Sequence, residues 1–181
     1  FQNYRNTTPQ VIECNFVDAI KAFCLVRKPT EKKQDQKVWS PTIFDGKRNK
    51  DNARSIHFLV YDMDDGVDKA TDVQKRLKEL DYSSSGSKIG YDKYRIIIPL
   101  SKPIECDLWK YTTDQKNEFY KSIGNGEPDQ KALKDKARIY SLCYRSENTF
   151  VYHNIGKCFE FDMKPIQDAH RKDLEEDEIR K

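Results

Sequence analysis

The segment that most limits how this chain can fold is HFLVYDMDDG, residues 57–66, where β-forming residues run into three aspartates and a glycine. Residues 55–63, SIHFLVYDM, are rich in side chains that favour strands, and Asp-Asp-Gly is a typical strand ending. Charged residues make up 35% of the chain and the hydrophobic class only 36%, so the core must be thin. We therefore expect residues 55–63 to form a central strand of that core.

Helices and strands are expected to follow one another in mixed order along the rest of the chain. Apolar residues spaced three or four apart, or a charged helical pattern, predict helices at 15–23, 67–80, 105–123 and 167–181. Runs of β-formers predict further strands near 38–44 and at 93–100, 138–144, 149–153 and 157–162. A Ser/Gly loop is expected at 83–90. This order predicts an α+β domain with helices packed on a mixed, largely antiparallel sheet.

Length and composition predict one domain and no membrane-spanning segment. The 181 residues fit a single domain, which we place at 1–165, followed by a charged helical tail or linker at 166–181. No run approaches the ~20 apolar residues of a membrane span, and the first residues lack a signal-peptide core, so we expect no membrane and a cytoplasmic protein. The five cysteines form no C-x-x-C pair, which argues against a disulfide framework or a zinc ribbon.

Asp62 and Asp64 are the first candidate site residues. Residues two apart on a strand point to the same face, so the two carboxylates are expected to project together. Their mutual repulsion favours a cation between them, and Mg²⁺ prefers carboxylate oxygens. The alternative is that Asp-Asp-Gly only closes a hairpin or caps the next helix.

A second group of candidates could bind the phosphates of a nucleotide. Hydroxyls and positive charge are supplied by Ser84, Ser85, Ser87, Lys88 and Arg95. If their segment pairs antiparallel with 55–63, these groups reach the same end of the sheet as the aspartates. The alternative is a flexible Gly/Ser hairpin loop.

Asp129 is a candidate third carboxylate, because it precedes a basic turn and the strand expected at 138–144. Three carboxylates would suffice for a two-metal site. The alternative is that Asp129 caps a helix behind Pro128.

Taken in order, these motifs resemble the archaeo-eukaryotic primase superfamily, in its plasmid- and phage-borne primase-polymerase branch. The resemblance covers residues 38–162 and rests on VWSPTIFDGKRNK, then LVYDMDDG, then YRIIIPLSKPI, and finally Asp129 ahead of Arg-Ile-Tyr at 138–140. It implies a primase catalytic core, in which a small α/β unit and an RNA-recognition-like sheet enclose a cleft. In that cleft, Asp62, Asp64 and Asp129 would hold two Mg²⁺ or Mn²⁺ ions.

The resemblance also implies an activity and partners. The activity is template-directed nucleotidyl transfer, as primase or DNA polymerase, in replication of a plasmid, phage or other mobile element. The partners are nucleoside triphosphates, a single-stranded DNA template and a helicase module, in a bacterial, archaeal or viral setting. The family has a Ser-x-His motif that contacts phosphate; aligned on this chain it falls on Ser84 and Gly86, so the histidine is missing.

Two other functions would use some of the same sequence features. A catalytically impaired or non-catalytic single-stranded nucleic-acid binding module explains the basic clusters and the missing histidine, but not the three aspartates. A rolling-circle initiator nuclease needs a His-x-His pair, which the sequence does not contain.

Overall fold

The computed structural model describes residues 2–3, 7–19, 37–88, 93–142 and 151–180. Its elements in chain order are β1 (Gln2–Asn3), β2 (Lys37–Trp39), β3 (Thr42–Phe44), β4 (Ala53–Met63), α2 (Ala70–Glu79), β5 (Ser84–Lys88), β6 (Tyr94–Glu105), the 3-10 helix η2 (Trp109–Thr112), α3 (Thr113–Ile123), α4 (Gln130–Lys134), β7 (Tyr140–Ser141), β8 (Val151–Asn154) and α5 (Met163–Ile179). The expected α+β class is confirmed.

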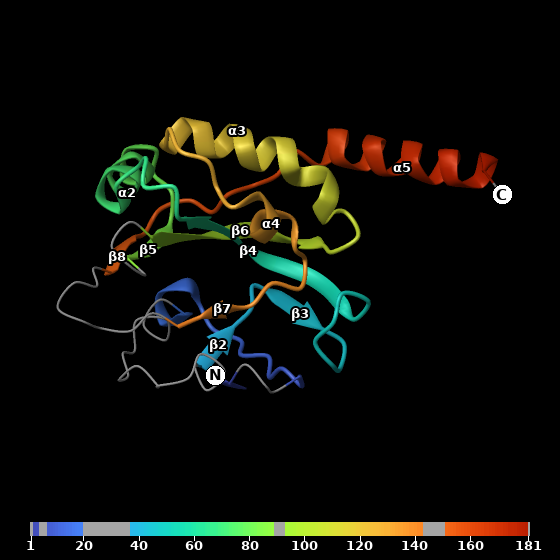
Figure 1. Ribbon diagram of the computed structural model, residues 1–181, viewed down its shortest axis with the longest axis horizontal. Coiled ribbons are helices and arrows are strands. Elements are labelled where there is room, and N and C mark those ends of the chain that lie inside the picture. The colour runs from blue at the N-terminus through green and yellow to red at the C-terminus, as the bar shows by residue number, and fades with distance from the viewer. Residues whose placement is uncertain (1, 4–6, 20–36, 89–92, 143–150, 181) are drawn as a thin grey trace.

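The strands form two antiparallel sheets. The larger has the order β3-β4-β6-β5-β8 and the smaller the order β1-β2-β7. Figure 1 shows α2, α3 and α5 on one side of the larger sheet, and β2 and β7 on its other side. The larger sheet is therefore the middle layer of the fold, and each of its faces has its own core.

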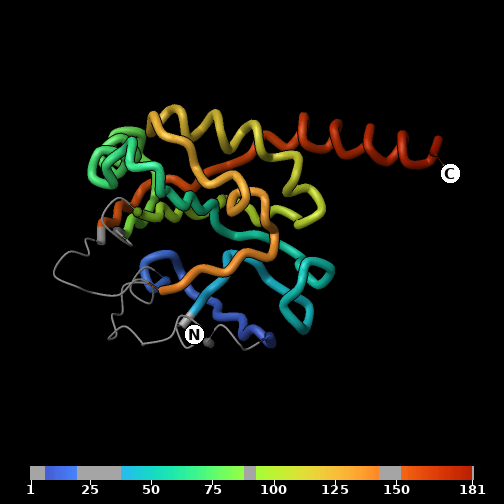
Figure 2. The backbone as a smooth tube through the Cα atoms, viewed as in Figure 1, coloured from blue at the N-terminus to red at the C-terminus, as the bar shows by residue number. Residues whose placement is uncertain are grey.

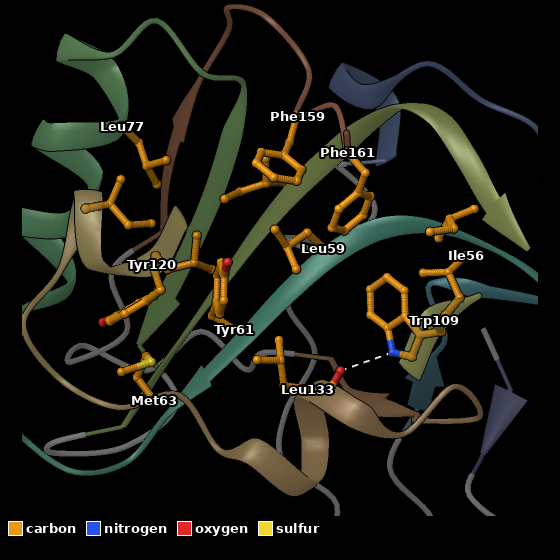
Figure 3. Packing of buried hydrophobic residues seen from close by; sticks show 14 of the residues in the cluster. Ile56, Leu59, Tyr61, Met63, Leu77, Trp109, Tyr120, Leu133, Phe159 and Phe161 are labelled. Atoms are coloured by element: carbon orange, nitrogen blue, oxygen red, sulfur yellow. Dashed lines mark hydrogen bonds between the residues drawn. The ribbon is translucent and has the colours of Figure 1, made fainter. Parts of the chain in front are cut away.

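Strand β4 supplies both cores through its alternation. Leu59, Tyr61 and Met63 are at most 1% exposed and pack with the helix layer (Figure 3). The residues between them point the other way: Val60 packs with Trp39 of β2 and with Tyr140 in β7. Asp62 follows Val60 on that second face, so it points toward the smaller sheet.

Helix α3 and the 3-10 helix before it cover the larger sheet as expected. Trp109 and Tyr120 are buried in the core, and Leu108, Tyr111 and Phe119 pack against it. Trp109 Nε1 also donates a 3.0 Å hydrogen bond to the carbonyl of Leu133, which fixes α4 against this layer (Figure 3).

The Ser/Gly segment is a strand and not the loop that the sequence predicted. Strand β5 pairs with β6 on one side and β8 on the other, so it lies inside the sheet. Helix α2 packs closely over it, because Gly86 leaves no Cβ in the way: a Cβ built there meets the Gln74 side-chain amide. The close packing of α2 on β5 requires small residues in the strand. A segment rich in Ser and Gly has the same composition as a typical loop.

Strand β6 runs through Pro99 to Glu105, beyond the strand expected at 93–100. Pro99 pairs with Phe58, but Ile104 pairs with Ile56, so β6 carries extra residues between those pairs. Such irregularities are where strands accommodate proline. Residues 157–162, expected as a strand, form only isolated bridges, from Lys157 to Tyr82 and from Phe159 to Leu100.

The helices expected at 15–23 and 67–80 differ in part from those in the structure. Asn15 caps the turn at 16–19 by accepting from the Asp18 N–H, but Val17 is 43% exposed; Ile20 and Phe23 lie outside the described residues. Helix α2 starts only at Ala70, which leaves Val67 exposed.

Helix α5 is longer than expected, because it starts at Met163, behind the capping residue Asp162. Its first turn buries Ile166 in the main core, and the rest projects beyond the sheet (Figure 1). The division at residue 165 stays a prediction. Within the described residues, none of the helices combines the length and the apolar character needed to cross a bilayer.

Candidate active site

A polar cavity of about 380 Å³ lies between the end of β4 and the segment that leads into β7. Its walls are formed by Arg48, Asp62, Arg95, Asp135, Ala137, Arg138, Ile139 and Ser141. Arginines outnumber carboxylates in this lining, so the cavity suits an anionic ligand. Figure 2 shows how the chain from 124 to 142 runs from the helix layer past β4 to the smaller sheet.

Asp62 is held by a bidentate ion pair with Arg95. The two residues face each other in the β4–β6 register, so their side chains project from the same face. Arg95 Nε lies 2.9 Å from Asp62 Oδ1, and Nη2 lies 3.3 Å from Oδ2. The Asp62 side chain is 19% exposed and that of Arg95 only 8%, so water screens this pair little.

Arg95 also connects the two sheets. Its Nη1 donates a 2.9 Å hydrogen bond to the carbonyl of Ser141 in β7, and its guanidinium lies over the Tyr140 ring at 4.5 Å. One arginine therefore fixes the direction of the Asp62 carboxylate and the distance between the two cavity walls.

Arg138 brings Asp129 to the same place. Its Nη2 lies 3.9 Å from Asp62 Oδ2 and 3.9 Å from Asp129 Oδ2, so the two carboxylates flank one guanidinium group. The Asp129 N–H donates a 3.0 Å hydrogen bond to the Asp62 carbonyl, which joins the backbones at this point. Asp62, Arg95 and Asp129, singled out separately in the sequence, are thus neighbours in the fold.

Asp129 is also the helix cap that the sequence offered as an alternative. Its Oδ1 accepts from the N–H groups of Lys131 and Ala132 at 2.9 and 3.2 Å. Its other oxygen faces Arg138. The two interpretations are compatible, because each uses a different oxygen.

Asp64 is placed differently from the other two carboxylates. It lies one residue beyond β4, its side chain is 56% exposed, and it pairs with Lys93 at 3.2 Å. Strand alternation therefore does not fix its direction, and it is not part of the cavity wall. Its role as a metal ligand stays a prediction.

The serines of β5 divide between the two faces of the sheet. Ser85 and Ser87 pair with Ile97 and Arg95, so both point to the Asp62 face, although neither lines the cavity. Ser84 points to the other face, where its buried hydroxyl donates to Gln74 of α2 at 3.0 Å. This placement opposes the predicted phosphate contact for Ser84. Lys88 is the last residue of β5.

Gly86 also lies on the helix face of the sheet. It pairs with Ile96, which is a residue of the helix-side core, and its missing Cβ would meet Gln74. The alignment that set Gly86 at the position of a phosphate-contacting histidine is therefore opposed by the register. A histidine at this position would point into α2.

The donor set fits a hard divalent cation only in part. Asp62 on the cavity wall and Asp129, on the other side of the Arg138 guanidinium, offer carboxylate oxygens, the ligand type that Mg²⁺ and Mn²⁺ prefer. Within the part of the chain that the structure describes, however, no group of three or more His, Cys, Asp or Glu side chains is arranged to hold a metal ion. A cation here must compete with the guanidinium groups of Arg95 and Arg138.

Four polar wall residues were not predicted as site residues. Arg48 lies in the basic turn before β4, and Asp135, Arg138 and Ser141 lie around the start of β7. The sequence signal for both arginines was the local clustering of basic residues. Clustering alone could not distinguish a cavity wall from a solvated turn.

Comparisons with known proteins give one distant match. No protein-family model matches the sequence, and no curated protein shows a significant match. Among solved structures, the fold is similar to that of the AEP domain of the cyanophage S-2L primase-polymerase, with a TM-score of 0.45 and 17% sequence identity. The match covers 71% of this chain and 66% of that chain. Similarity at this level assigns neither a family nor a function.

Proposed function

We propose that this domain is a nucleotidyltransferase that adds nucleotides to a strand opposite a single-stranded DNA template, with Mg²⁺ or Mn²⁺ as cofactor. The observation that supports this most is that Asp62, Arg95 and Arg138 line one polar cavity, while Asp129 flanks the same Arg138 guanidinium. They come from three separate segments, in the order of the motifs that resemble the primase superfamily.

Asp62 and Asp129 are the residues that would hold a divalent ion, through the oxygens that now face Arg95 and Arg138. When bound, the ion would stabilise negative charge on a phosphoryl group and lower the pKa of an attacking hydroxyl. The exposed Asp64 would complete the carboxylate set by turning away from Lys93.

The arginines would bind the triphosphate of the incoming nucleotide. Guanidinium groups contact phosphate oxygens in a bidentate manner and keep their charge at every relevant pH. Arg48 and Arg138 reach the cavity from outside the large sheet, whereas Arg95 is fixed by Asp62 and Ser141. Positioning and neutralising the phosphates is the main contribution that side chains make to phosphoryl transfer.

A second candidate is a single-stranded nucleic-acid binding module without catalysis. It is favoured by one observation: both oxygens of Asp62 are occupied by Arg95. An arginine-neutralised carboxylate would serve as structural support below a phosphate-binding surface.

Labelled-nucleotide incorporation on a primed single-stranded DNA template separates the two candidates. The transferase extends the primer with Mn²⁺ or Mg²⁺ and stops with EDTA. The binding module retards the template in a gel, with or without metal, and never extends the primer. Template binding without extension under any metal condition would overturn the proposal. A helicase module acting with this domain is a further proposal, to be tested by co-purification from the native source.

A further inference from the structure

The acidic segment after β4 contacts the loop before Asp129, and these contacts do not involve the cavity. The carboxylate of Asp68 accepts from the backbone N–H groups of Asn125 and Gly126, each at 2.7 Å, through Oδ2. Asp65 Oδ2 accepts from the N–H of Glu127 at 2.7 Å. Three successive amides of this loop are thus bound by two side-chain carboxylates.

The loop is shaped to admit these carboxylates. A Cβ on Gly124 would lie 2.6 Å from Asp68 Oδ2, and a Cβ on Gly126 would lie 2.5 Å from Asp65 Oδ2. Real Cβ atoms do not approach so closely, so both positions need glycine for these contacts.

Asp68 also ties the loop to the helix layer. The Tyr120 hydroxyl of α3 donates to Asp68 Oδ2 at 3.0 Å, and the Tyr94 hydroxyl of β6 lies 3.1 Å from that of Tyr120. Burial of the Asp68 carboxyl raises its pKa. Hydrogen bonds from Gly126, Asn125 and Tyr120, together with the charge of Arg76, lower the pKa by more than burial raises it, so the net shift is downward. The ionised form is the one that holds the loop.

Asp129 follows this loop directly, and its N–H is bonded to the Asp62 carbonyl. We propose that Asp65 and Asp68 are positioning residues, which hold residues 124–127 so that the Asp129 carboxylate lies beside Asp62. The inference rests on the proposed function only for the role of Asp129 itself. It assigns the last aspartates of DMDDGVD to loop anchoring through backbone amides, rather than to metal binding.

Amide hydrogen exchange of the whole domain, read by NMR, tests this without substrate or metal. In Asp68→Ala we expect the amides of Asn125 and Gly126 to exchange about tenfold faster, and in Asp65→Ala we expect the same for the amide of Glu127. About a tenfold change in exchange rate corresponds to the loss of one hydrogen bond. The Asp129 amide must become faster as well. Asp72→Ala, an exposed aspartate on α2, is the matched control and leaves all four amides unchanged.

Two further variants guard against general destabilisation. Asp68→Asn keeps an acceptor of the same shape, so it should restore part of the protection that Asp68→Ala loses. Gly126→Ala should reproduce the effect of Asp65→Ala, because its Cβ displaces that carboxylate. If the Asp129 amide keeps its protection when the loop amides lose theirs, the positioning role is wrong. Failure of nucleotide incorporation would overturn the proposed function but leave this exchange result standing.

Discussion

Arg95 holds both carboxylate oxygens of Asp62, with Nε 2.9 Å from Oδ1 and Nη2 3.3 Å from Oδ2. The same guanidinium bonds the Ser141 carbonyl in the smaller sheet. This one residue therefore joins β4, β6 and β7, and removing it should affect stability as well as the site.

We expect Arg95→Ala to lower the free energy of unfolding by about 2–4 kcal/mol, because it leaves a half-buried carboxylate without its partner. Arg138→Ala is the matched control. Its guanidinium is 3.9 Å from Asp62 and its side chain is 36% exposed, so the loss should be under about 1 kcal/mol. Urea unfolding of both variants measures the difference. Equal losses would show that Arg95 does not connect the two sheets.

Asp129 can be tested as a cap and as a ligand separately. Asn is as good an N-cap as Asp, so Asp129→Asn should preserve α4 and change stability by less than about 0.5 kcal/mol. It removes the charge that a divalent ion needs, so incorporation should fall at least about a hundredfold. Thermal unfolding and primer extension on the same preparation give the two readouts. An active Asp129→Asn variant would leave Asp129 as a cap only.

Gly86 is expected to be a packing residue of β5. Gly86→Ala should destabilise the fold by about 1–3 kcal/mol, since the new methyl group meets Gln74. Adding Gln74→Ala to the Gly86→Ala variant removes the side chain that the new methyl group meets. The double variant should therefore recover much of the lost stability, which a double-mutant cycle detects as coupling. Gly86→His should not tighten nucleotide binding. Additive losses in the cycle would show that the two residues do not conflict.

Lys116 is the fully buried cation of the described core. Its Nζ donates to the Leu133 carbonyl at 2.9 Å and lies 3.7 Å from the centre of the Trp109 ring. Desolvation, and to a smaller degree the charge of Lys134, lower its pKa to about 7. The unfolded chain therefore binds more protons than the folded one between about pH 7 and 10.5, and stability should rise across that window.

Lys116→Met should remove this pH dependence and raise stability at pH 6 by about 1–3 kcal/mol. The Leu133 carbonyl keeps a donor in the variant, because Trp109 Nε1 also bonds it at 3.0 Å. Urea unfolding at pH 6 and pH 9 checks both statements. A wild-type protein that is equally stable at both pH values would show that Lys116 is not desolvated as described.

Sequence reasoning predicted the parts of the fold that depend on residue type and periodicity. The strand at 55–63 follows from its β-forming residues, and the helices at 67–80 and 105–123 follow from apolar residues three or four apart. Strand β5 was missed because Ser and Gly are common in loops, whereas here they let α2 approach the sheet.

The site was predicted less completely than the fold. The sequence predicts both Asp62 and Arg95 as site residues, but their pairing depends on the β4–β6 register. Arg48 and Arg138 reach the cavity from turns, whose direction no local pattern determines. The same holds for Asp65 and Asp68, whose partners are backbone amides about 60 residues away.

Primer extension by Asp62→Asn measures the central claim most directly, since Asn keeps the shape of the side chain and removes its charge. We expect incorporation with Mn²⁺ to fall at least about a hundredfold relative to wild type, while template binding in a gel is retained. Asp177→Asn, on the exposed end of α5, is the control and should extend the primer at the wild-type rate. Wild-type incorporation by Asp62→Asn would contradict the account, because the cavity beside Asp62 would then not be the site of catalysis.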